Sequence, residues 1–198
     1  MKTVTITPEE MESCIARFGS LKPQSDQHQE GHGLPKEAYE MMTAKTLYLL
    51  MSPETQGGPM AQGPAITTTD KLSVIIAECP PGDSPMLHAH HRTKESFLCL
   101  DGRFLIRYGD KGEHETYLEP YDMISVPVGV VRQFENVTDK PARLLVIIVG
   151  GEEDDFNDVE FTPEEADRVR ARFGNEMVER FREIGFSFEA GVDGESAG

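Results

Sequence analysis

Between residues 67 and 149, short apolar runs alternate with clusters of turn-forming residues. Three of these clusters are Pro80-Pro81-Gly82-Asp83, Asp101-Gly102 and Gly109-Asp110-Lys111-Gly112. Proline presets φ and glycine permits positive φ, so such clusters limit strands to a few residues. Many short strands at close spacing are typical of a sandwich or barrel. The expected strands are 45–51, 67–79, 86–91, 95–100, 103–109, 115–118, 123–126, 131–137 and 142–149.

Helices are expected on both sides of these strands. Thr7-Pro8-Glu9-Glu10 has the residues of a capping box and predicts a helix to Phe18. Residues 35–42 predict a second, short helix. A third opens at Thr162 and carries one apolar stripe on its face. The stripe comprises Ala166, Val169, Phe173, Met177, Phe181 and Ile184. The pattern Thr-Pro-Glu-Glu-x5-Ala-Arg-Phe-Gly occurs at both 7–19 and 162–174, which suggests that the two helices pack in related ways.

These elements divide the chain into three parts. Residues 1–45 form an N-terminal helical arm with a loop, 46–150 hold the strands, and 151–198 hold an acidic loop, a helix and a flexible tail. A chain of 198 residues is long enough for one domain with a sizeable core.

The run from Gly82 to Gly102 carries the chemistry. Side chains alternate along a strand, so His88 and His90 point to one face. Glu95 opens the next predicted strand after a short polar connection. Two imidazoles and one carboxylate from adjacent strands make a facial set of metal ligands that leaves positions open for substrate or dioxygen.

This run resembles the first motif of the cupins, Gly-x5-His-x-His, three or four residues, Glu, six residues, Gly. The second cupin motif, Gly-x5-Pro-x-Gly-x2-His-x3-Asn, is matched at Pro127, Gly129 and Asn136. Tyr121 stands in the place of its first glycine. The resemblance covers about residues 46–150 and implies a double-stranded β-helix, or jelly-roll barrel, with helices at both ends. It does not imply a reaction, because this fold hosts many functions.

Arg132 stands where the family has its fourth metal ligand, a histidine. Guanidinium has only donors and cannot ligate a metal. A dication about 5 Å from it would be repelled by roughly 6–7 kcal/mol at an effective dielectric near 20. Arg132 could pair with Glu95 in a metal-free barrel, hold a substrate carboxylate or enolate beside the metal, or swing toward the rim. A one-residue bulge could instead turn Gln133 inward as a neutral oxygen ligand.

The alternation of side chains also predicts the pocket. Met86 shares a face with His88 and His90, and Phe134 shares one with Arg132. Phe97 and Cys99 share a face with Glu95. An apolar pocket with one metal and one arginine suits a small anionic organic molecule.

Two classes of function remain open. The first is a metal-dependent enzyme in which Glu95 and Arg132 act on the substrate. Fe(II) would suit dioxygenase-like oxidoreductase chemistry, and Mn, Ni or Zn would suit an isomerase or lyase. The second is a non-catalytic cupin that binds a small molecule without metal, with Arg132 paired to Glu95.

Charge and cysteines limit the partners. The formal net charge is −16, from 19 basic and 35 acidic residues, which disfavours nucleic acid and anionic membranes. No run approaches 18 apolar residues, the N-terminus lacks a signal-peptide core, and the three cysteines form no CxxC, so we expect a cytoplasmic protein.

Exposed sheet edges and the stripe from Val169 to Phe181 favour a homodimer, although the stripe could equally pack on its own barrel. The other histidines, such as His28, His32 and His114, have no assigned role.

Overall fold

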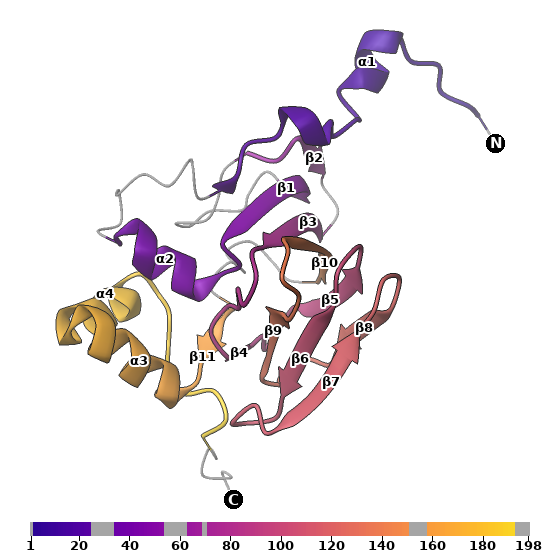
Figure 1. Cartoon of the computed structure of the whole chain (residues 1–198). Coiled ribbons are helices and arrows are strands. Elements are labelled where there is room, and N and C mark those ends of the chain that lie inside the picture. Colours follow the sequence, from indigo (N-terminus) through magenta and orange to yellow (C-terminus); the bar gives the residue numbers. More distant parts are fainter. Residues whose placement is uncertain (1, 25–33, 54–62, 69–70, 151–157, 193–198) are drawn as a thin grey trace, which may run out of the picture.

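The computed structural model describes residues 2–24, 34–53, 63–68, 71–150 and 158–192. The sequence also predicts loops at 20–34, 52–66 and 151–161, and most of these residues, with His28 and His32, lie outside the described ranges. Two sheets form the body of the protein (Figure 1). The six-stranded sheet has the order β2-β1-β3-β10-β5-β8, and the five-stranded sheet has the order β11-β4-β9-β6-β7.

The six-stranded sheet is antiparallel except for one pair, β1 with β2. Its strands are β1 (Thr46–Pro53), β2 (Ile66–Thr68), β3 (Leu72–Cys79), β5 (Lys94–Cys99), β8 (Met123–Val126) and β10 (Ala142–Val149). The five-stranded sheet is antiparallel throughout. It contains β4 (His88–Ala89), β6 (Phe104–Tyr108), β7 (His114–Leu118), β9 (Arg132–Asn136) and β11 (Glu160–Phe161). This mainly β, jelly-roll architecture with terminal helices confirms the predicted fold class.

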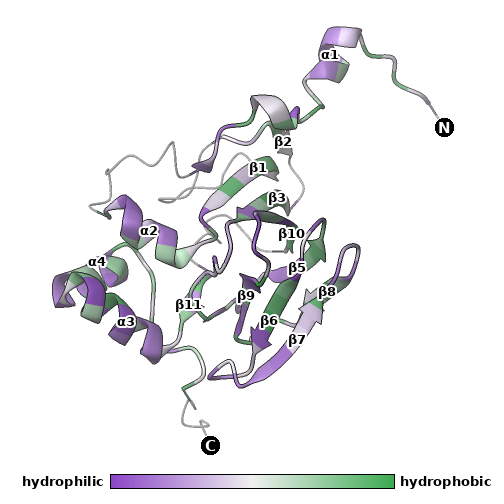
Figure 2. Ribbon diagram, in the orientation of Figure 1, coloured by the Kyte–Doolittle hydropathy of each residue, from purple (hydrophilic) through white to green (hydrophobic). Residues whose placement is uncertain are grey.

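The protein has two main cores. The first lies between the sheets, and its largest members are Phe97, Phe104, Ile106, Phe134 and Leu144. The second packs Met86 and strand β11 against three helices, α2 (Lys36–Met42), α3 (Pro163–Phe173) and α4 (Asn175–Glu183). Figure 2 shows hydrophobic residues concentrated in the strands, whereas α3 and α4 carry mostly hydrophilic residues. None of the helices described combines the length and the apolar character that a membrane span requires.

Two helix predictions were wrong in length. The N-terminal helix α1 (Pro8–Glu12) ends well before Phe18, and a 3-10 helix follows at Phe18–Ser20. The predicted capping box at Thr7 forms, but α1 buries none of its residues, and a short helix without packing gains little stability. The C-terminal helix is broken into α3 and α4 at Gly174, whose φ of 88° lies outside the helical region.

The nine predicted strands occur in the right order, but the described residues form eleven strands, and some of the predicted ends were wrong. Strand β11 lies in the segment that was predicted to be an acidic loop. The predicted strand 67–79 is two strands, β2 and β3, and the predicted strand 86–91 is reduced to His88–Ala89. The apolar stripe of the C-terminal helices faces their own chain, because Val169 and Phe181 are fully buried in the second core. The stripe is therefore not available for an interface between subunits.

Candidate metal centre

The candidate site lies where the two sheets face each other. His88 is in β4, His90 follows directly after it, and Arg132 opens β9 as the Cα partner of His88. Glu95 comes from β5 in the other sheet. Antiparallel pairing puts side chains 88 and 132 side by side on one face, so four polar side chains meet in the interior.

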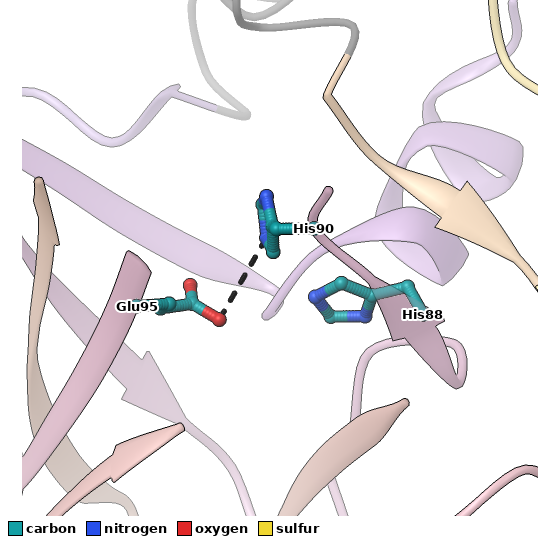
Figure 3. A group of neighbouring side chains, drawn as sticks. All are labelled: His88, His90 and Glu95. Carbon is teal, nitrogen blue, oxygen red and sulfur yellow. Dashed lines mark ion pairs between the residues drawn. The ribbon is translucent and has the colours of Figure 1, made fainter. Parts of the chain in front are cut away.

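The two histidines and Glu95 form a compact donor set (Figure 3). All three side chains are buried, and one ligand atom from each lies within 4.8 Å of the others. His90 Nε2 is 3.8 Å from Glu95 Oε2. Donor atoms on one transition-metal ion lie about 3–3.5 Å apart, given metal–ligand bonds near 2.1 Å. Small side-chain movements would bring these three atoms onto one ion, so the residues fit a divalent transition metal.

Hydrogen bonds fix the orientation of both imidazoles. His88 Nδ1 is 2.7 Å from the carbonyl oxygen of Met86, which can only accept, so this nitrogen donates. His90 Nδ1 is 3.1 Å from Thr93 Oγ1. The Thr93 hydroxyl donates its proton to Asp158, so its oxygen accepts from His90. Each Nε2 then carries a free lone pair, which is the tautomer that a metal requires.

The charge state of His88 agrees with this arrangement. Burial, together with the nearby Arg132 guanidinium, lowers the pKa of His88 to about 3, and the Met86 carbonyl only partly offsets this. The imidazole is therefore neutral at physiological pH. A neutral imidazole is the form that coordinates a metal.

Arg132 forms a buried ion pair with Glu95. Its Nε and Nη2 donate to Glu95 Oε2 at 3.1 and 2.7 Å, and its Nη1 lies 3.4 Å from the His88 carbonyl oxygen. Only 2% of the Arg132 side chain and 8% of the Glu95 side chain are exposed. Burial raises the pKa of the Glu95 carboxyl and lowers that of the Arg132 guanidinium. Direct contact opposes both effects and holds the two groups as an ion pair.

Comparison with known families agrees with this geometry. The model of the cupin domain family matches residues 75–148. These residues form a cupin domain. A search of curated proteins gives no match.

Several solved structures resemble the chain in part. The capsular polysaccharide assembling protein CapF from Staphylococcus aureus is 21% identical over 59% of this chain and 31% of its own, with a TM-score of 0.46. A sugar phosphate isomerase from Silicibacter pomeroyi is 25% identical over 41% of this chain and 52% of its own, with a TM-score of 0.38. The Schizosaccharomyces pombe Cnp3 cupin domain is 13% identical over 68% of this chain and 72% of its own, with a TM-score of 0.44. The chain thus spans about a third of CapF and half of the isomerase.

The glycines of the cupin motifs adopt the backbone shapes for which glycine is suited. Gly82, Gly102 and Gly129 all have positive φ, and a Cβ at Gly102 would lie 2.4 Å from the Cβ of Ala142. Tyr121, in the place of a motif glycine, also has a positive φ of 75°. Tyrosine therefore carries a backbone strain at this position that glycine would not.

The pocket residues predicted from strand alternation divide between the two cores. Phe97, Cys99 and Phe134 lie in the core between the sheets, with the rings of Phe97 and Phe134 5.3 Å apart. Burial raises the pKa of the Cys99 thiol to about 11, so it is not a ready nucleophile. Met86 lies in the second core, because pairing of β4 begins only at His88 and does not carry the alternation back to Met86. Its contribution to the site is the carbonyl that orients His88.

The alternative placement of Gln133 does not occur. Strand β9 pairs with β6 in unbroken register from Arg132 to Asn136, so no bulge turns the next residue inward. The Gln133 side chain donates to the Pro85 carbonyl oxygen at 2.6 Å. Arg132, the residue three after Gly129, therefore lies against Glu95 and beside His88.

Sequence reasoning missed Asp158. The acidic composition of 151–161 predicts a loop, and nothing in it singles out one carboxylate. In the structure Asp158 is 3% exposed and accepts hydrogen bonds from the backbone of the His90–Glu95 connection. Burial opposes its charge, but these bonds outweigh the effect and lower the pKa of Asp158.

Proposed function

We propose that this cupin domain binds one divalent transition metal through His88, His90 and Glu95, and that Arg132 holds a small anionic organic molecule beside the ion. The observation that carries the proposal is the orientation of the imidazoles. Both Nδ1 atoms are engaged by fixed acceptors, so both Nε2 lone pairs are available near Glu95. A structural histidine pair has no need of this common orientation.

The charges in the site define the class of ligand. Glu95 carries one negative charge, and the buried Asp158 near His90 carries a second. These two charges cannot balance the three positive charges of a dication and the Arg132 guanidinium. Unpaired buried charge is expensive, so a further anion is expected in the site. A carboxylate or enolate suits this role, because its oxygens can take the planar N–H fork of arginine and also reach the ion. Apolar neighbours such as Phe97 and Phe134 would then favour an organic anion over an inorganic one.

The reaction class depends on the ion, which the donor set leaves open among Fe, Mn, Ni and Zn. Bound iron would supply oxygen chemistry of the dioxygenase type, and the other ions would supply the Lewis acidity used by isomerases and lyases. In each case Arg132 would orient the substrate and Glu95 would provide the carboxylate at the reacting centre.

A second candidate function is supported by the ion pair itself. Two hydrogen bonds already satisfy Glu95 Oε2, and a metal would have to compete for that oxygen or use the other. In this alternative the domain binds a small molecule without metal and without catalysis. The buried Arg132–Glu95 pair then serves to recognise the ligand.

Metal titration separates the two candidates. Calorimetric addition of Zn²⁺ to metal-free protein should show one site in the wild type and none in His88→Ala. His114→Ala is the matched control, because His114 is an exposed histidine outside the site, and it should bind as the wild type does. Wild-type protein without a zinc site would favour the metal-free alternative, as would unchanged binding by the double variant His88→Ala/His90→Ala.

We also propose a cytoplasmic homodimer, on more limited grounds. Strands β7 and β8 each end one of the two sheets, and no further strand pairs with them within the described residues. Helix α1 buries none of its residues against its own chain. Sedimentation velocity at micromolar concentration should give about twice the 22.0 kDa mass of one chain. A species of the single-chain mass would remove the proposal.

A further inference from the structure

The segment that follows the cupin domain is tied closely to the metal-ligand connection. Asp158 Oδ1 accepts from the backbone N–H of His91 at 3.0 Å and of Arg92 at 3.1 Å. Its Oδ2 accepts from the backbone N–H of Arg92 at 2.9 Å and of Thr93 at 2.7 Å. One carboxylate thus accepts from three successive backbone N–H groups, those of the first three of the four residues between His90 and Glu95.

The same carboxylate reaches His90 through one side chain. The Thr93 hydroxyl donates to Asp158 Oδ2 at 2.9 Å and accepts from His90 Nδ1, 3.1 Å away. Asp158 Oδ2 lies 3.9 Å from that nitrogen, too far for a direct hydrogen bond. An ionised carboxylate can only accept, so it sets the direction of the hydroxyl, and the hydroxyl sets the proton on the imidazole.

We propose that Asp158 and Thr93 are positioning residues that hold His90 in the metal-binding tautomer, so that a residue beyond the cupin domain completes the metal centre. This inference rests on the proposed metal binding. Carboxylate partners of ligating histidines fix ring orientation and raise the basicity of the coordinating nitrogen. Here the partner acts through one intervening hydroxyl.

The rest of the segment supports the other histidine. Strand β11 pairs with β4 and puts Phe161 opposite His88, with their rings 6.2 Å apart. Thr162 donates its N–H to the Leu87 carbonyl oxygen at 3.2 Å, and Glu165 accepts from the Leu87 N–H at 3.0 Å. The start of α3 therefore holds the residue just before His88 from both sides, while Asp158 holds the residues just after His90.

Three substitutions test the role of the hydroxyl. Thr93→Val keeps the shape of the side chain and removes the hydroxyl that links Asp158 to His90. Thr93→Ser keeps this hydroxyl and removes the methyl group. Thr162→Val is the matched control, because Thr162 is equally buried and its Oγ1 has no hydrogen-bond partner among the described residues. Its contact with Leu87 comes from the backbone N–H, which valine keeps. Each variant is titrated with Zn²⁺ alone.

Loss of an orienting partner typically weakens metal binding by about 10–100-fold. We expect Thr93→Val to weaken zinc binding by about 10-fold or more, and Thr93→Ser and Thr162→Val to stay close to the wild type. If Thr93→Val binds like the wild type, or if Thr93→Ser is as weak as Thr93→Val, the proposal is overturned.

A second measurement does not depend on metal. The ¹⁵N chemical shifts of the His90 ring in metal-free protein report which nitrogen carries the proton. The proposal predicts a proton on Nδ1 in the wild type and a mixture of tautomers in Thr93→Val. A wild-type proton on Nε2 would overturn it, even if Thr93→Val does not fold. Failure of wild-type zinc binding with the Nδ1 tautomer intact would instead count against the proposed function alone.

Discussion

The buried ion pair between Arg132 and Glu95 makes a quantitative prediction about stability. Arg132→Met keeps a long apolar side chain but removes both donors to Glu95 Oε2. Because the Glu95 side chain is only 8% exposed, water cannot replace these two bonds. Removing one partner of a buried pair costs about 3–5 kcal/mol. We expect a loss of this size in the free energy of unfolding of the metal-free protein at pH 8.

The size of the loss should depend on pH, because Glu95 can take up a proton once Arg132 is gone. Burial already raises the pKa of the Glu95 carboxyl, and the substitution removes the cation that opposes this effect. A group whose folded-state pKa is raised contributes stability below its unfolded value, and this is lost as pH rises through the folded value. Arg132→Met should therefore be less destabilising at pH 5 than at pH 8.

Urea unfolding at both pH values measures this effect. Arg107→Met is the matched control, since Arg107 also pairs with a glutamate, Glu135, but both side chains are about 30% exposed. Exposed pairs contribute about 0–1 kcal/mol, so the control should lose little stability and show no comparable pH dependence. The reasoning is refuted if Arg132→Met costs no more than Arg107→Met, or costs the same at pH 5 and pH 8.

Three further predictions concern single residues. Arg132→His adds a third imidazole, and thus a fourth ligand, beside His88 and removes the repelling cation, so Zn²⁺ should bind at least about 10-fold more tightly by calorimetry. Equal or weaker binding would contradict this prediction. Tyr121→Gly removes the strain of a positive φ but loses more backbone conformational entropy on folding. The net effect should raise the free energy of unfolding in urea by about 0.5–1 kcal/mol. A destabilised variant would show that the tyrosine has contacts that outweigh the strain. Asp158→Asn should lower stability at pH 7 by about 2 kcal/mol, because hydrogen bonds to a charged acceptor are lost. The pKa of Asp158 is lowered, so its contribution is present above the unfolded value near 3.9 and is lost as pH falls through the folded value. The difference between wild type and variant should therefore shrink in acid unfolding experiments, and a constant difference would count against the role of its charge.

The part of the fold that depends on local signals could be predicted from the sequence. Turn residues bound each strand, so the ends of 123–126 and 142–149 agree with β8 and β10. The spacing of His88, His90 and Glu95 needs only strand alternation and a short connection, and the structure brings these side chains together. Arg132 lies beside them because the turn at Pro127 and Gly129 is followed directly by β9, a strand in regular register.

The parts that depend on tertiary contacts could not be predicted. The N-terminal sequence has every helix-start signal, but without packing its helix ends at Glu12. The apolar stripe of the C-terminal helix continues through Gly174, so the periodicity hides the break that the positive φ of this glycine makes. The repeated pattern is also misleading. Glu10 closes a capping box on Thr7. The equivalent Glu165 forms no capping box with Thr162 and instead accepts a hydrogen bond from the Leu87 N–H.

Asp158 could not be predicted for the same reason. It lies in a run of acidic residues, and its partners are backbone N–H groups about 66 positions earlier in the chain. Backbone donors carry no sequence signal. The division of the chain at residues 45 and 150 remains a prediction, although the contacts of Asp158 and Glu165 already join the third part closely to the second.

The most direct test of the central claim is a crystal structure of the protein grown with Co²⁺, measured at wavelengths on either side of the cobalt absorption edge. The account predicts one anomalous peak within bonding distance of His88 Nε2, His90 Nε2 and a Glu95 oxygen, with Arg132 turned from Glu95 toward a bound anion. An Arg132–Glu95 pair left intact, with no anomalous peak between the two histidines at saturating cobalt, would contradict it.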